Sequence, residues 1–147
     1  MGFDGIYRMY AKNDNGDYEE MALFNRDGKK LYTMFPSRDG MINQALLGYN
    51  RHGYDFEAIG DGRGMPSWYL EKNPDYDTPN EGTWYDYVEL RGYRRNSNYS
   101  FVDYYSDNED KRNPIDDFMR IADMYLELFG KWYPKPGEII IICEMSY

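Results

Sequence analysis

The sequence predicts an α+β fold in which an antiparallel sheet packs against one main C-terminal helix and one short helix, with a long ordered loop. Three observations predict it. Strand-like runs separated by Asn-Gly and Asp-Gly turns fill the first 36 residues, one strongly periodic helix follows Asn113, and an uninterrupted apolar run covers Ile139 to Ile142. A chain of 147 residues has the length of one ordinary domain and can bury a real core, so we expect a single domain over 1–147.

The first 36 residues have the pattern of a meander. We expect strands at Phe3 to Ala11, Tyr18 to Phe24 and Lys30 to Phe35. The breaks between them contain Asn15-Gly16 and Asp27-Gly28, pairs that accept the positive φ angles of short antiparallel connections.

A short helix is predicted next, with Ser37 as its N-cap and Gly48 just past its end. Its apolar residues fall on one face, at Met41, Ile42, Ala45 and Leu46. From Tyr49 to Gly82 periodicity is lost, and a loop this long is usually functional or disordered. Its tyrosines and tryptophan favour an ordered loop, because such residues normally pack on something.

The second half begins with a predicted strand over Thr83 to Arg95, and Tyr99 to Tyr105 fits either a strand or a short helix. Asn113 caps the main helix, Pro114 occupies its first position, and Gly130 ends it. Its apolar stripe consists of Ile115, Phe118, Ile121, Ala122, Tyr125, Leu128 and Phe129. Glu138 to Met145 is predicted to be a terminal strand buried on both faces.

Composition limits the function classes. The net charge of −9 opposes nonspecific binding to nucleic acid or to an anionic membrane, although a local arginine pocket can still bind a small anion. Cys143 is the one cysteine, which excludes an intramolecular disulfide and fits a reducing cytosol. The first residues lack a basic segment followed by an apolar core, so we expect a cytoplasmic protein.

Complete catalytic motifs are missing. His52 is the one histidine, and it has neither a nucleophile elbow nor a cysteine near it in sequence. Asp55, Glu57 and Asp61 could bind magnesium, but their spacing is not that of a calcium loop and solvated acids are the simpler interpretation. We therefore predict a protein that is not an enzyme, with no catalytic residue, metal or cofactor.

The segment from Gly60 to Trp68 combines three glycines, an arginine, a proline and a tryptophan, which is typical of a binding loop. A tight turn with an exposed arginine is the alternative. Arginine forks match phosphate or carboxylate, and aromatic faces stack on bases, so nearby residues could complete a nucleotide pocket. The alternative for each arginine is pairing with a surface carboxylate. The predicted ligand-binding residues are Arg38, Gly62, Arg63, Gly64, Trp68, Trp84, Tyr87 and Arg91.

Three segments carry a resemblance: Ser37 to Asn50, Arg63-Gly64-Met65-Pro66, and Trp84 to Leu90. In this order they resemble small uncharacterised phage and prophage proteins with an arginine-led helix, an Arg-Gly-Leu-Pro loop and a Trp-containing segment. The chain departs from that pattern after Arg38, where an Asn-Tyr pair is usual, and near Trp84, where tyrosines replace a His-Ser pair. The resemblance implies a phage genome, hence the host cytoplasm, and a counter-defence role.

These observations give a leading hypothesis and two alternatives. The leading one is a non-enzymatic counter-defence protein that sequesters a small anionic, nucleotide-derived ligand beside the Arg63 loop. The alternatives are an acidic inhibitor that binds a host defence protein or nucleic-acid-binding protein, and a carboxylate or metal-dependent enzyme. Many aromatics predict a homo-oligomer, most simply a dimer, with the region from Tyr49 to Tyr93 at the contact.

Overall fold

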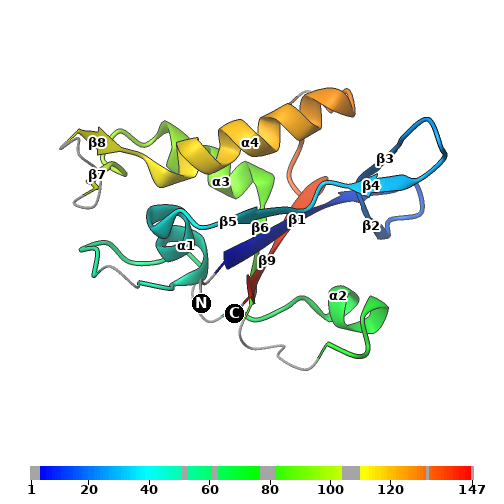
Figure 1. The fold of residues 1–147 in the computed structure, drawn as a ribbon, viewed down its shortest axis with the longest axis horizontal. Helices are drawn as coiled ribbons and strands as arrows, with labels where there is room; N and C mark the ends of the chain where they lie inside the picture. The colour runs from blue at the N-terminus through cyan, green and yellow to red at the C-terminus, as the bar shows by residue number, and fades with distance from the viewer. Residues whose placement is uncertain are drawn as a thin grey trace.

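The computed structural model describes residues 4–50, 53–60, 63–76, 82–103, 110–131 and 133–146 (Figure 1). In chain order its elements are β1 (Asp4–Lys12), β2 (Tyr18–Glu20), β3 (Ala22–Phe24), β4 (Lys30–Tyr32), β5 (Phe35–Ser37), α1 (Gly40–Leu47), α2 (Ser67–Lys72), β6 (Thr83–Asp86), α3 (Tyr87–Arg95), β7 (Phe101–Val102), β8 (Lys111–Arg112), α4 (Pro114–Leu128) and β9 (Ile139–Ser146).

An antiparallel sheet forms the centre of the fold, in the order β2-β1-β9-β6. Strand β5 pairs with the same edge of β1 as β2 does, further toward the start of β1. Figure 1 shows α1, α3 and α4 on one side of this sheet and α2 on the other. The predicted α+β class, with an antiparallel sheet packed against helices, is confirmed.

Strand β9 is central and buried on both faces. It pairs with β1 over eight residue pairs and with β6 over four. Ile139 and Ile141 face the core under α4, while Ile140 and Ile142 face a second cluster under α2. The apolar run therefore serves both faces, as the sequence predicts for a strand without alternation.

Helix α4 forms where its capping residues predict it. The Asn113 side chain accepts hydrogen bonds from the backbone N–H groups of Ile115 and Asp116, at 2.9 and 3.1 Å. Pro114 lies in the first turn, where its missing N–H costs nothing. The buried face is Pro114, Ile115, Phe118, Met119, Ala122 and Leu126.

The N-cap of α1 is Asp39, so the prediction of Ser37 was wrong. Asp39 accepts from the N–H groups of Met41 and Ile42, at 3.0 and 3.2 Å. Ser37 ends strand β5 instead, and its hydroxyl accepts from the Asp39 N–H at 3.2 Å. Gly48 closes the helix at φ 71°, a left-handed angle that suits glycine, as predicted.

Two helices were not predicted. The long loop contains α2, whose Tyr69 is buried against the second face of the sheet. The predicted strand from Thr83 to Arg95 ends at Asp86, because the Asp86 side chain caps α3 by accepting from the Val88 N–H at 3.0 Å. Alternation along this segment concealed a helix whose buried residues, Tyr87 and Leu90, are three apart.

The N-terminal meander is interrupted twice. Both predicted turns join antiparallel strands, but the strand expected at Tyr18 to Phe24 breaks at Met21, whose N–H donates to the Met9 carbonyl at 2.9 Å. The strand expected at Lys30 to Phe35 likewise divides into β4 and β5, so β3 and β4 form a separate two-stranded hairpin. Of the segment from Tyr99 to Tyr105, Phe101 and Val102 form β7, while residues 104 and 105 lie outside the described part.

We predict that Phe118→Ala lowers the free energy of unfolding by about 3–5 kcal/mol, because a fully buried ring leaves a cavity. Phe118 contacts Tyr7 edge-on at 5.0 Å and Phe35 at 5.5 Å between ring centroids. Urea denaturation measures the change. Lys72→Ala at an exposed position on α2 is the control, and we expect about 0.5 kcal/mol or less. A Phe118→Ala loss as small as that of the control would contradict this packing.

Candidate functional site

Arg63 is held by the protein itself. Its guanidinium donates to both carboxylate oxygens of Glu89 on α3, at 2.7 and 2.5 Å, and to the backbone carbonyl of Trp84 at 3.0 Å. The same group lies 5.0 Å from the centroid of the Tyr85 ring and 5.4 Å from that of Trp84. A two-pronged arginine–carboxylate pair is a strong and geometrically specific contact, so the Arg63 loop joins the edge of β6 to α3.

The glycines of this loop permit close packing. A Cβ at Gly60 would lie 2.7 Å from the Tyr85 ring and 2.9 Å from Arg63 Nε, which is too close for any side chain. Gly64 has a φ of 69°. Gly62 lies outside the described residues. Gly60 thus allows Arg63 to pack against the Tyr85 ring of its own sheet.

The other predicted site residues are separated. Trp68 packs on the α2 side of the sheet, 4.7 Å from the Tyr18 ring and 5.1 Å from the Tyr10 ring. Arg38 pairs with Asp4 at 2.7 Å, and its side chain is 74% exposed. The structure therefore does not gather Arg38, Arg63 and Trp68 around one ligand.

Tyr87 and Arg91 do lie together, in a pocket between α3 and α4. The Arg91 guanidinium lies 5.3 Å from the Tyr87 ring centroid and donates to the Pro134 carbonyl at 2.8 Å. The Tyr87 hydroxyl donates to Asp123 on α4 at 2.6 Å. These contacts fix one tyrosine and one arginine on the α3 wall.

The pocket has a volume of about 560 Å³, within the range of small-molecule sites. It is lined by Tyr87, Arg91, Arg94, Arg95, Asp116, Asp123, Leu126, Glu127, Lys131, Tyr133 and Pro134. Four of these residues carry a positive charge and three a negative charge. In a chain of net charge −9, this is a local excess of cations.

Arg94 bonds two of the carboxylates that line the pocket. It donates to Asp116 at 2.6 Å and also to Asp123, and Asp116 accepts a further hydrogen bond from Arg120 at 3.0 Å. Burial alone would raise the pKa of Asp116, but the hydrogen bonds from Arg94 and Arg120 outweigh burial and hold that pKa below its usual value. Both aspartates are thus engaged with Arg94.

The side chains of Arg95 and Lys131 make no hydrogen bond or ion pair with another residue of the described ranges, although both residues line the pocket. Tyr133, at the same pocket, has a φ of 53°, and its side chain is 84% exposed. A non-glycine residue in the left-handed region is uncommon, and such residues gather at binding sites. The pocket therefore combines two uncommitted cations with an exposed aromatic ring.

The pocket residues outside the predicted ligand-binding set include Arg94, Arg95, Lys131 and Tyr133. The first two follow Tyr87 and Arg91 at helical spacing. That signal was concealed by the prediction of a strand, in which Arg94 would lie on the face opposite Tyr87, Arg91 and Arg95.

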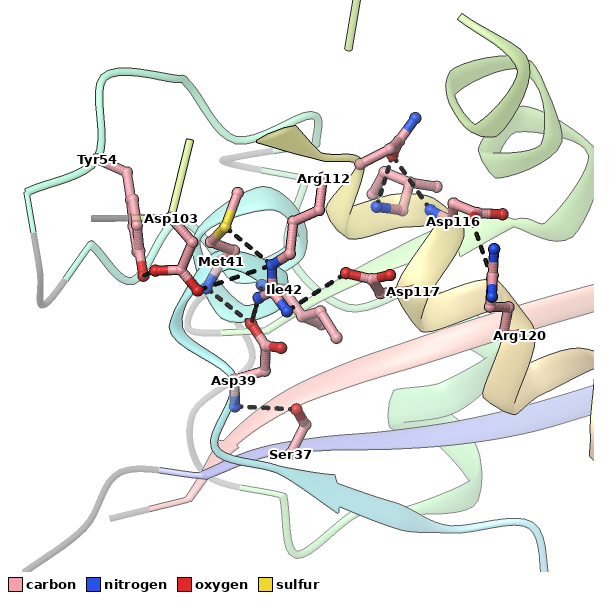
Figure 2. Close-up of polar contacts among 12 residues, drawn as sticks. Ser37, Asp39, Met41, Ile42, Tyr54, Asp103, Arg112, Asp116, Asp117 and Arg120 are labelled. Carbon is pink, nitrogen blue, oxygen red and sulfur yellow. Dashed lines mark hydrogen bonds and ion pairs between the residues drawn. The ribbon is translucent and has the colours of Figure 1, made fainter. Parts of the chain in front are cut away.

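A second polar cluster surrounds Arg112 (Figure 2). Its guanidinium contacts three carboxylates, bonding Asp39 and lying 3.4 Å from Asp117 and 3.8 Å from Asp103. Tyr54 donates to Asp103 at 3.1 Å. The cluster connects α1, α4 and the end of β7, which is a structural role.

The magnesium alternative is not supported within the described residues, where no three His, Cys, Asp or Glu side chains could together hold a metal ion. Asp55 and Glu57 are exposed there, while Asp61 and His52 lie outside the described ranges. Among the described helices, none is long and apolar enough to cross a bilayer.

Comparisons with known proteins give no assignment: no family model, no curated protein and no solved structure matches this chain.

We predict that Arg63→Ala lowers the free energy of unfolding by about 1–2 kcal/mol, because the Glu89 carboxylate and the Trp84 carbonyl lose their donor. Arg63→Lys restores less than half of this, since an ammonium group cannot make the two-pronged contact. Urea denaturation of Arg63→Ala, Glu89→Ala and the double variant measures the coupling. Strictly additive losses would show that the pair contributes nothing to stability.

Proposed function

We propose that this protein binds a small anionic ligand of the nucleotide type in the pocket between α3 and α4. The observation that carries the proposal is the excess of cations around this cavity in an otherwise acidic chain. The proposal keeps Tyr87 and Arg91 from the predicted site and moves its centre from the Arg63 loop to α3.

The distant acidic surface does not oppose such binding. At physiological ionic strength, charges are screened over about 8 Å, so a ligand inside the pocket interacts mainly with the residues that line it. Arg95 and Lys131 can donate to a phosphate without giving up a contact seen in the described part of the chain. A phosphate is therefore the expected anionic group.

Aromatic side chains would bind the base of the nucleotide. Tyr133 exposes its ring at the pocket, and Tyr87 contributes a ring already paired with the Arg91 guanidinium. Base–aromatic stacking contributes about 1–3 kcal/mol per base and tolerates different bases. A ligand with both a phosphate and a base satisfies both features of the pocket.

The polar groups of the pocket favour binding of the ligand over a chemical reaction on it. Burial, with the hydrogen bond to Asp123 next, raises the pKa of Tyr87 to about 12, so its hydroxyl stays protonated at neutral pH. Asp116, with a lowered pKa, is a weak base. Sequestration is accordingly the proposed activity, and counter-defence by removal of a nucleotide signal is the role we propose from the resemblance to phage proteins.

One experiment distinguishes ligand sequestration from the two alternatives, an enzyme and an acidic protein-binding inhibitor. The protein is incubated with a nucleotide extract of cells and isolated by gel filtration, and its ligand is then released by heating. Recovery of an unchanged nucleotide supports sequestration. A chemically changed nucleotide supports the enzyme alternative, and a co-eluting cellular protein supports the acidic inhibitor.

We predict that AMP binds more tightly than adenosine in titration calorimetry, because only AMP presents a phosphate to Arg95 and Lys131. Arg95→Gln and Lys131→Gln should each weaken AMP binding by about tenfold or more, equivalent to about 1.4 kcal/mol. Lys72→Gln, at an exposed lysine on α2, changes the net charge equally and serves as the control. Equal affinity for AMP and adenosine, or equal effects of all three variants, would contradict this site.

A further inference from the structure

The exposed large hydrophobic side chains of the described residues are concentrated in two places. Those on the β3–β4 hairpin and the segment after it, which we call the hairpin patch, are Leu23, Phe24, Leu31, Tyr32 and Met34. Those on the outer face of α4, which we call the helix patch, are Ile121, Met124 and Leu128. Tyr133 is the ninth such residue and belongs to neither patch. The described part of the region from Tyr49 to Tyr93, where the sequence predicts the contact, contributes none.

The exposure of both patches is large. Phe24 is 70% exposed, Met124 66% and Leu128 65%. Isolated apolar residues are common on protein surfaces, but contiguous apolar patches usually mark an interaction site. Each patch thus indicates an interaction surface.

The hairpin patch is rigidly presented. At the tip, the Asn25 N–H donates to the Lys29 carbonyl at 2.9 Å, and the Asn25 side chain accepts from the N–H groups of Asp27 and Lys29 at 3.0 and 2.8 Å. At the base, the Thr33 N–H donates to the Met21 carbonyl at 3.0 Å. A segment already ordered in its binding conformation loses little entropy when it binds.

The two patches lie at the same end and on the same side of the molecule. Figure 1 shows the hairpin and the C-terminal end of α4 extending in the same direction. Phe35, just after the hairpin, stacks on Tyr125 of α4 at 5.6 Å. Leu23 and Leu31 share strand parity with the buried Met21 and Thr33. Phe24 and Tyr32, which pair with Lys30 and Ala22, lie on the other face of the hairpin. A single contact can therefore cover the helix patch together with Leu23 and Leu31.

Their charges are opposite. The hairpin tip carries three cations, Arg26, Lys29 and Lys30, against one carboxylate, Asp27. Of the four carboxylates on helix α4, Asp116 and Asp123 are paired with Arg94 and Asp117 lies 3.4 Å from Arg112. Glu127, next to Leu128, is the one without an ion pair among the described residues. Hairpin against hairpin would bring like charges together, and so would helix against helix. Hairpin against helix brings opposite charges together.

We propose that two copies of this chain form a twofold dimer in which the hairpin patch of each copy covers the helix patch of the other. A twofold axis makes this contact twice. When a residue of the first copy contacts a residue of the second, the same residue of the second copy makes the equivalent contact with the first. The occupant is a second copy because one chain presents both complementary surfaces side by side. The inference is independent of the α3–α4 pocket and of its ligand.

The first test is sedimentation at micromolar concentration, with Leu31→Asp as the hairpin variant and the double change Met124→Glu, Leu128→Glu as the helix variant. The wild-type chain should sediment at twice its mass of 17.6 kDa. Each variant should weaken the dimer by about tenfold or more, since a charge replaces a buried apolar contact at both copies of the interface. Tyr133→Ser, at a still more exposed position outside the patches, should leave the dimer unchanged.

The decisive test mixes the two variants. In the mixed dimer, the wild-type hairpin of the helix variant meets the wild-type helix of the hairpin variant, so one of the two contacts is intact. Mixing should therefore restore association that neither variant shows alone. Circular dichroism melting of each variant confirms that the exposed changes leave the fold intact.

Three results would overturn the proposal: a monomeric wild-type chain, loss of the dimer in the hairpin variant alone with the helix variant unaffected, or no recovery on mixing. The second would indicate a hairpin-to-hairpin contact, and the third a contact that does not cross between the patches.

Discussion

The fold depends on the burial of β9 from both sides. Its four isoleucines cannot be covered by one layer, since alternate residues point to opposite faces of the sheet. One face needs α1, α3 and α4, and the other needs the segment that contains α2. The segment that contains α2 thus packs on the sheet because the side chains on that face of the central strand must be buried.

Tyrosine is abundant because it suits this two-sided core. Tyr7 and Tyr85 are fully buried, and each hydroxyl has a partner: Tyr7 donates to Asn43 on α1 at 2.7 Å, and Tyr85 donates to the Leu46 carbonyl at 2.6 Å. The Tyr85 hydroxyl also accepts from the Gly60 N–H at 3.0 Å, which fastens the region after α1 to the sheet. Burial raises the pKa of both tyrosines, so both remain neutral donors at physiological pH. The rings fill the core while the hydroxyls satisfy polar groups that a leucine would leave unpaired.

Local signals predicted the elements whose ends are fixed by local chemistry. The Asn113 cap and the proline after it specify the start of α4, and the Asn-Gly and Asp-Gly turns specify the hairpins. The predicted apolar stripe of α4 was only partly right, because Ile115, Phe118 and Ala122 are buried whereas Ile121 and Leu128 are exposed. Helix α3 was missed because nine residues that begin directly after a strand show too little periodicity to separate the two states. The partner of Arg63 could not be read from the sequence either, since Glu89 lies 26 positions away and is one of 26 acidic residues. Chain connectivity, which composition does not contain, decides which carboxylate meets which arginine.

The excess of acidic residues in the chain makes the cationic lining of the pocket unusual. Where carboxylates outnumber cations by nine, most arginines are expected to find a partner, and Arg8, Arg38, Arg63, Arg94, Arg112 and Arg120 do. A cavity where cations outnumber anions is then a departure from the rest of the surface. A long polyanion would have to approach past the acidic surface outside the pocket, whereas a small anion contacts only the pocket itself. An acidic protein with a cationic cavity can in this way select a small phosphate-bearing ligand over nucleic acid, with no base-specific contact needed for that distinction.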